Sequence, residues 1–151
     1  MYSYRAYVIN ELEQYITVLN INPEDGTPSL AGEIPYTVDG AMEDDAQTGA
    51  EIALTQDGVT LYASHRNYDG NGAMLVFTVK DESPFLIQIQ SISTSGSVPR
   101  FFTIVGQHVL VPDQVDSVID VFKMDPEDLG KLNLVELNSC GLEPTCLAVI
   151  T

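Results

Sequence analysis

Five polar residues of this sequence lie at the ends of short apolar runs, and together they could bind a negatively charged ligand. Glu11, Arg66 and Gln114 each follow a short apolar run, and they recur roughly every 50 residues. Glu51 and Arg100 each lie at the start of another apolar run. Arginine donates two parallel hydrogen bonds to a carboxylate or a phosphate, so two arginines favour an anionic ligand. Glu11 beside them can accept a proton or orient a water molecule, and Glu51 and Gln114 can contact the ligand.

The same residues also have a plainer, structural interpretation. Glu11, Glu51 and Arg66 can form a ring of ion pairs that joins neighbouring parts of the fold without touching a ligand. His65 precedes Arg66, and side chains alternate along a strand, so we expect His65 to point the other way and to serve in packing. Residue types alone leave both interpretations open.

The elements that position these residues are repeated hairpins. Three short apolar runs end in a polar pair, at 6–11, 61–66 and 109–114. A second strand follows each of them, at 16–21, 74–79 and 118–124. An acidic turn appears twice, as N-P-E-D-G at 22–26 and as D-P-E-D-L-G at 125–130. A period of roughly 40 to 50 residues with strands only is typical of β-propeller blades.

The sequence therefore predicts an all-β fold, a partial β-propeller with about two full four-stranded antiparallel blades. We place these blades at 50–94 and 101–138, a partial blade at 1–38 and the first strand of a further blade at 145–151. Such units bury their apolar faces only against neighbours, so we expect this chain to be part of a larger ring. Open blade edges would favour self-association.

Strand polarity predicts where the five side chains meet. Neighbouring strands of a blade run in opposite directions, so the end of the second strand and the start of the first lie at the same edge. Glu11, Arg66 and Gln114 end second strands, whereas Glu51 and Arg100 begin first strands. All five should face one mouth of the central channel.

Net charge, apolar content and cysteine number limit which partners and locations are expected. The formal charge of −16, from 22 acidic and 6 basic residues, disfavours nucleic acid and anionic membranes. No stretch approaches the roughly 20 apolar residues of a membrane span, and no signal peptide is evident, so a cytoplasmic location is expected. Two cysteines, Cys140 and Cys146, are too few for a zinc site and are expected to be free thiols.

Three ordered motifs resemble the lactonase family of seven-bladed β-propellers, which includes propeller-type 6-phosphogluconolactonases and carboxy-muconate cyclases. They are Tyr7–Leu12, 50–66 and Gly96–Phe101, and the resemblance extends over essentially the whole chain, as the C-terminal part of such a protein. It implies a hydrolase that opens a small anionic lactone of the pentose phosphate pathway, with no required metal or cofactor.

The resemblance also implies roles for individual residues. Glu11 and Arg66 match active-site residues of the muconate cyclase, and Arg66 and Arg100 would hold the substrate anion. A histidine from an upstream blade of that enzyme has no counterpart here, and Thr145 replaces an arginine of the repeated Pro-Arg motif. We therefore expect this chain alone to be inactive. The alternatives are a cyclase or lyase acting on a dicarboxylate, and a non-catalytic scaffold that binds proteins through its rim.

Overall fold

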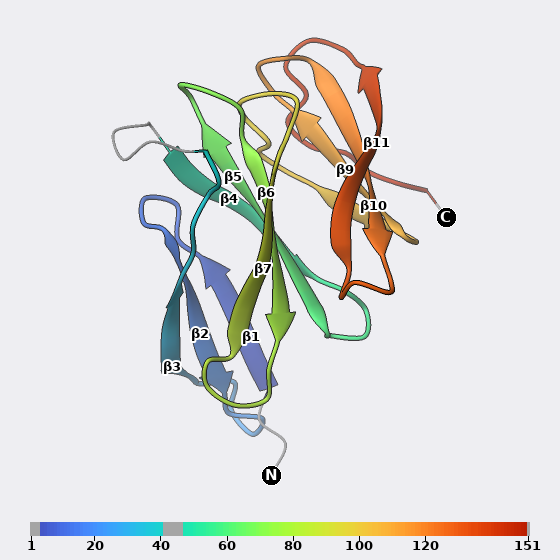
Figure 1. Ribbon diagram of the computed structural model, residues 1–151. Helices are drawn as coiled ribbons and strands as arrows, with labels where there is room; N and C mark the ends of the chain where they lie inside the picture. Colours follow the sequence, from blue (N-terminus) through green and yellow to red (C-terminus); the bar gives the residue numbers. More distant parts are fainter. Residues whose placement is uncertain (1–3, 41–46, 151) are drawn as a thin grey trace.

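The computed structural model describes residues 4–40 and 47–150, which form three antiparallel sheets and no helix (Figure 1). The first sheet has the order β1-β2-β3, with β1 Tyr4–Ile9, β2 Tyr15–Ile21 and β3 Pro28–Pro35. The second has the order β4-β5-β6-β7, with β4 Gln47–Leu54, β5 Thr60–Asn67, β6 Ala73–Val79 and β7 Leu86–Ser93. The third has the order β8-β9-β10-β11, with β8 Thr103–Val105, β9 His108–Asp113, β10 Val118–Asp125 and β11 Lys131–Ser139. The prediction of an all-β fold with four-stranded antiparallel sheets is confirmed.

Aspartate-glycine turns close the hairpins, and one of them is the acidic turn predicted at 125–130. Asp57 Oδ1 accepts hydrogen bonds from the Thr55 hydroxyl (2.6 Å) and from the Val59 amide (3.0 Å), and Gly58 has a φ of 71°. Asp125 Oδ1 accepts the Glu127 amide at 2.9 Å, and Gly130 has a φ of 79°. Aspartate closes such turns through its own side chain, and glycine adopts a positive φ without steric cost.

The core consists of two layers of side chains, one on each face of the second sheet. Tyr62, Met74 and Val76 pack with Phe122 and other residues of the third sheet. On the opposite face, Leu61, Ala63, Leu75 and Phe77 pack with Ile16 and Tyr36 of the first sheet and the segment after it. Residues 60–67 of β5 are all buried because both faces of this sheet are covered. Each sheet thus buries its apolar face against a neighbour.

Several predicted boundaries differ from the structure. The second sheet begins at Gln47 rather than at residue 50, and the third runs from Thr103 to Ser139 rather than over 101–138. Residues 145–150, expected as a first strand, form no strand. A strand needs a neighbour for its backbone hydrogen bonds, and none of the described strands pairs with this segment.

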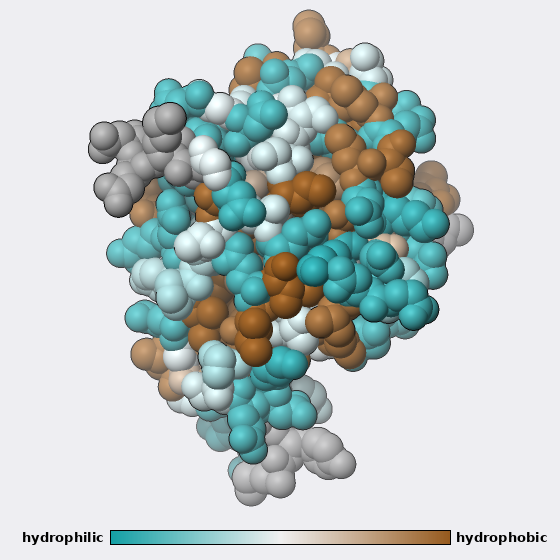
Figure 2. Space-filling model, viewed as in Figure 1, coloured by the Kyte–Doolittle hydropathy of each residue, from teal (hydrophilic) through white to brown (hydrophobic). Residues whose placement is uncertain are grey.

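Hydrophobic side chains lie exposed on β11, the edge strand of the third sheet. Leu134, Val135 and Leu137 are 46%, 54% and 53% exposed. On the face in Figure 2, hydrophobic residues gather at the upper right, where Figure 1 places β11. An apolar edge strand is a template for pairing with another chain.

We predict that the 151-residue chain self-associates through β11. Replacing Val135 and Leu137 together by lysine should shift sedimentation-velocity profiles toward the monomer. The lysines reduce the net negative charge, so electrostatic repulsion between copies cannot explain a loss of association. Asn133→Lys, on the same exposed strand, is the control and should leave the profile unchanged. A monomeric wild-type chain at all concentrations would contradict the prediction.

Candidate functional site

Backbone hydrogen bonds join the ends of the three sheets into one continuous rim. The Gly49 amide donates to the Glu11 carbonyl at 3.0 Å, which ties the start of β4 to the end of β1. At the end of β5, the Asn67 amide donates to Ser97 O at 2.9 Å. Beyond β9, the Gln114 amide donates to Val98 O at 3.0 Å. We call this edge the rim: residues 10–11, 47–49, 66–68, 97–100 and 113–114. The structure thus has Glu11, Arg66, Arg100 and Gln114 on one edge.

An ion pair between Glu11 and Arg66 is the central polar contact of the rim. Arg66 Nη2 lies 2.7 Å from Glu11 Oε1 and also donates to the Gly49 carbonyl at 2.9 Å. The Arg66 side chain is only 10% exposed, whereas that of Glu11 is 64% exposed. A buried cation therefore holds a carboxylate that remains open to solvent.

The loop that carries Glu11 is itself fixed from below. The Asn10 amide group donates to the Tyr15 carbonyl at 3.0 Å and to the Thr17 hydroxyl at 2.9 Å. Asn10 therefore closes the β1–β2 hairpin with its side chain. These two hydrogen bonds fix the backbone just before Glu11, and the Glu11 side chain is thereby oriented toward Arg66.

Arg66 has less capacity for a ligand than the sequence suggests. Two donors on Nη2 are engaged by Glu11 and Gly49, and Nη1 donates to the Tyr68 hydroxyl at 3.3 Å. A bidentate fork on an incoming anion would require Arg66 to give up one of these partners. The Tyr68 contact was not predicted, although its position two residues after Arg66, on the same side of an extended chain, is a signal that could have indicated it.

Arg100 and Gln114 lie on the same edge but are not drawn into that ion pair. In the described part of the chain, no hydrogen bond or ion pair joins either side chain to Glu11 or Arg66. Arg100 is exposed, and its backbone amide donates to Val98 O at 2.8 Å. The Gln114 amide donates to the same carbonyl. The Arg100 guanidinium is therefore the available cation of the rim.

Glu51 lies at a different place from the one predicted. It does not begin β4, because a bulge between Gly49 and Ile52 lengthens this strand toward the rim, and Thr48 is the residue opposite Arg66. The Glu51 carboxylate accepts the amide of Ile52 at 3.0 Å, and the Glu51 amide donates to the Ser64 hydroxyl at 3.0 Å. Glu51 therefore helps to close the bulge, and the expected substrate contact by Glu51 stays a prediction.

His65 lies beneath the rim in a buried network. It is 0% exposed, and its Nε2 lies 2.9 Å from Gln47 Oε1 while Nδ1 lies 3.2 Å from the Tyr36 hydroxyl. An amide oxygen only accepts, so Nε2 carries the proton and Nδ1 accepts from Tyr36. Burial, with the Arg66 charge as a second cause, lowers the pKa of His65 to about 4. A neutral, inaccessible imidazole agrees with the predicted packing role.

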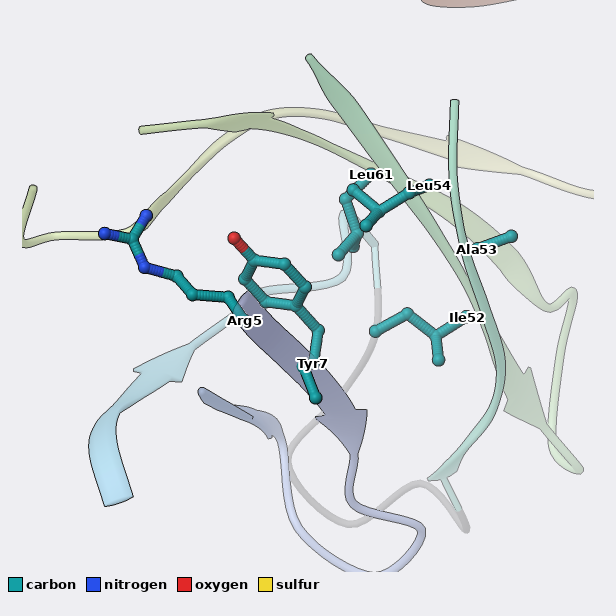
Figure 3. Close-up of a pocket in the computed structure, with 7 residues that line it drawn as sticks. Arg5, Tyr7, Ile52, Ala53, Leu54 and Leu61 are labelled. Atoms are coloured by element: carbon teal, nitrogen blue, oxygen red, sulfur yellow. The ribbon is translucent and has the colours of Figure 1, made fainter. Parts of the chain in front are cut away.

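Two hollows in the described part of the chain lie away from this rim. One has a volume of about 120 Å³ and is lined mostly by apolar residues of β1 and β4, with Leu61 of β5 (Figure 3). Its charged residue, Arg5, donates to the carbonyls of Lys80 and Asp81. Among the described residues, no group of three or more His, Cys, Asp or Glu is arranged to hold a metal ion. No described helix is long and apolar enough to cross a membrane.

The comparisons with known proteins agree with this architecture. Residues 3–149 match the family profile described as lactonase, 7-bladed β-propeller. The chain is 30% identical over 149 residues to a 6-phosphogluconolactonase of Bacillus subtilis (strain 168), covering 94% of this chain and 40% of that protein. It is 30% identical over 132 residues to a 6-phosphogluconolactonase of Formosa agariphila, covering 84% and 35%.

Solved structures share the fold. A protein from Lactobacillus plantarum has a TM-score of 0.81 at 28% identity, covering 94% of this chain and 40% of the other. A periplasmic gluconolactonase from Pseudomonas aeruginosa has a TM-score of 0.74 at 21% identity, covering 90% and 39%, and shows the fold alone. The chain thus spans about 40% of the length of these relatives.

Proposed function

The chain belongs to the lactonase family of seven-bladed β-propellers, and we propose that it supplies part of the active site of a hydrolase that opens a phosphorylated sugar lactone. The observation that carries the proposal is the solvent-open carboxylate of Glu11, held at 2.7 Å by the buried guanidinium of Arg66. Relatives named 6-phosphogluconolactonase support the substrate class. The reaction would belong to the pentose phosphate pathway, in the cytoplasm.

Each rim residue has a chemical role in this proposal. Glu11 accepts a proton from a water molecule as the water oxygen bonds to the lactone carbonyl carbon. The tetrahedral intermediate then collapses, the ring C–O bond breaks, and the proton passes to the departing alkoxide. Arg66 holds Glu11 in place and contributes positive charge near the developing oxyanion. The exposed guanidinium of Arg100 binds the phosphate of the substrate, and Gln114 beside it offers an amide.

The remaining residues of the active site would come from chain beyond this segment. The chain covers about 40% of its relatives, and its described hydrogen bonds leave Glu11 and Arg100 on the rim without a shared partner. We therefore propose that the 151-residue chain binds anions weakly and does not turn over lactone by itself. No metal or cofactor takes part in the proposed steps.

A chimera tests this proposal. Residues 3–149 would replace the matching segment of the Bacillus subtilis 6-phosphogluconolactonase, and hydrolysis of 6-phosphogluconolactone would be followed above its spontaneous rate. Glu11→Gln should lower kcat about 100-fold or more, as expected for loss of a general base. Arg100→Met should mainly raise KM, and Glu127→Gln, in an exposed turn on another edge, is the control. Unchanged turnover in Glu11→Gln and Arg66→Met would remove these residues from the mechanism.

The same chimera separates the rival functions. Preference for a carboxylated muconolactone over the phosphorylated lactone would favour a cyclase-type activity. A folded chimera with neither activity would favour a binding scaffold. Either result would exclude the lactonase proposal for this segment.

A further inference from the structure

Two aspartates of the third sheet are fully buried side by side. Asp113 ends β9 and Asp120 lies in β10, and both are 0% exposed. Asp113 pairs with Val118 and Asp120 pairs with Val111, so the two carboxylates share one face of the sheet. Neither oxygen of Asp113, nor Oδ1 of Asp120, accepts a hydrogen bond of ordinary geometry from the described residues; the Thr94 hydroxyl and the Val98 amide lie near Asp113 and only partly offset the rise of its pKa. A buried carboxylate with no partner is costly in its charged form.

The segment 94–100, which joins β7 to β8, lies across these carboxylates. Asp120 Oδ2 accepts the Ser95 amide at 2.7 Å, and Asp116 Oδ2 accepts the Ser97 amide at 2.8 Å. A Cβ atom on Gly96 would lie 2.7 Å from Asp113 Cγ and 2.6 Å from Asp116 Oδ2. Only glycine fits between the carboxylates, so the segment rests directly on Asp113.

The same segment positions one side of the rim. Val98 O accepts the amides of both Arg100 (2.8 Å) and Gln114 (3.0 Å), and Gln114 directly follows Asp113. Gly96 O accepts the Gly72 amide at 2.8 Å, which ties the segment to the second sheet. A displacement at Asp113 would therefore move Arg100, because the segment 94–100 carries it, and Gln114, because Gln114 is bonded directly to Asp113.

No positive charge compensates the buried pair. The ion pairs within residues 4–40 and 47–150 are Arg66–Glu11 and Lys131–Asp128, neither of which involves it. The charges that act on Asp113 are those of Asp120 on β10 and Asp116 in the β9–β10 turn, both negative. Burial first, and then the charge of Asp120, raises the pKa of Asp113 to about 7.

We propose that Asp113 gains and loses a proton in the neutral range and is a positioning residue for Arg100 and Gln114, so that loss of this proton weakens anion binding at the rim. Ionised Asp113 would repel Asp120 and Asp116 and lift the segment 94–100 that both aspartates hold. The consequence for anion binding rests on the proposed function, whereas the movement of the segment does not.

Nuclear magnetic resonance on the 151-residue chain tests the positioning without a ligand. The carboxyl carbon of Asp113, assigned by its loss in Asp113→Asn, should titrate near pH 7. The sequence has three arginines, so three side-chain Nε–H signals are expected. The Arg100 Nε–H and the Gln114 amide should shift with the same midpoint as Asp113. In Asp113→Asn this shift should vanish, while Asp125→Asn, at the far end of β10, should retain it.

Sulfate, whose charge does not change across the neutral range, is the probe for binding. We expect its affinity, followed by the Arg100 Nε–H signal, to fall about fivefold from about pH 6 to about pH 8, the lower end of typical coupling between sites. Asp113→Asn should bind at both pH values as the wild type binds at pH 6. A positioning role predicts this flattened pH profile, which a merely structural role would not produce.

The outcomes separate the two proposals. An Asp113 carboxyl that titrates in the ordinary acidic range, or rim signals that ignore its midpoint, would overturn the positioning role. If Asp113→Asn does not fold, the wild-type titrations alone decide, and Asp120→Asn should lower the midpoint of Asp113 because one negative charge is gone. Coupled titration without any sulfate binding would support the positioning role and contradict the proposed anion site.

Discussion

Replacing Gly72 by alanine is expected to lower the free energy of unfolding by about 3 kcal/mol or more. A Cβ atom there would lie 2.3 Å from Pro99 Cδ, 2.6 Å from Pro99 Cγ and 2.9 Å from the His65 carbonyl oxygen. None of these atoms can move freely, because Pro99 is a buried ring and the His65 oxygen belongs to the backbone of a buried strand. The Gly72 amide and carbonyl also bond to Gly96 O (2.8 Å) and to the Thr94 amide (2.9 Å). Any relief of the clash would break this link between sheets.

Urea denaturation followed by circular dichroism gives the measurement. The control is Gly70→Ala in the same loop, where the new atom would meet only the Asn67 side chain, with Nδ2 at 3.1 Å and Cγ at 3.8 Å, and no backbone atom. We expect this variant to lose less than about 1 kcal/mol. Similar losses in the two variants would show that the loop yields, and that Pro99 does not hold the segment 94–100 against the second sheet.

The sequence predicted the hairpins and their shared edge because these follow from local signals. Period-two runs and aspartate-glycine turns recur along the chain, and antiparallel pairing then sets which strand ends meet. The proximity of Glu11 and Arg66, which are 55 residues apart, followed from the repeat alone. Residues at equivalent positions of a repeat occupy equivalent places in each unit, even where their side chains differ.

The parts that were missed depend on contacts that no local pattern encodes. The bulge in β4 adds one residue between Gly49 and Ile52 relative to β5 and places Thr48, not Glu51, opposite Arg66, and no local sequence pattern marks where that residue is inserted. Asp113 looks like a polar strand end open to solvent, yet a segment from the preceding sheet covers it completely. Strand polarity placed Arg66 and Arg100 on one edge, but it could not show that Glu11, Gly49 and Tyr68 already engage Arg66.

The second large effect concerns pH and the buried His65. Its pKa is about 4 in the folded chain against an ordinary 6.5, so as pH falls the unfolded chain binds the proton first. The free energy of unfolding should therefore decrease from about pH 6.5 to about pH 4, by about 3 kcal/mol in all, and lose nothing more from this group below that. Protonation would also require the Tyr36 hydroxyl, 3.2 Å from Nδ1, to turn its hydrogen away and accept instead of donate.

Asp113 acts in the opposite sense over an overlapping range, and this decides how the experiment is designed. Its raised pKa means that the folded chain keeps a proton that the unfolded chain releases, so stability falls as pH rises from about 4 to about 7. The pH dependence of the wild-type chain alone would show the two effects partly cancelled.

The contribution of His65 is isolated by comparing the wild type with His65→Gln. Asp113 is present in both chains, so its contribution cancels in the difference between their free energies of unfolding. This difference should shrink by about 3 kcal/mol on acidification, with His108→Gln, an exposed histidine, as the matched substitution. A difference that stays constant from about pH 7 to about pH 4 would mean that His65 takes up its proton as readily in the folded chain as in the unfolded one, and the neutral Tyr36–His65–Gln47 network would then be wrong.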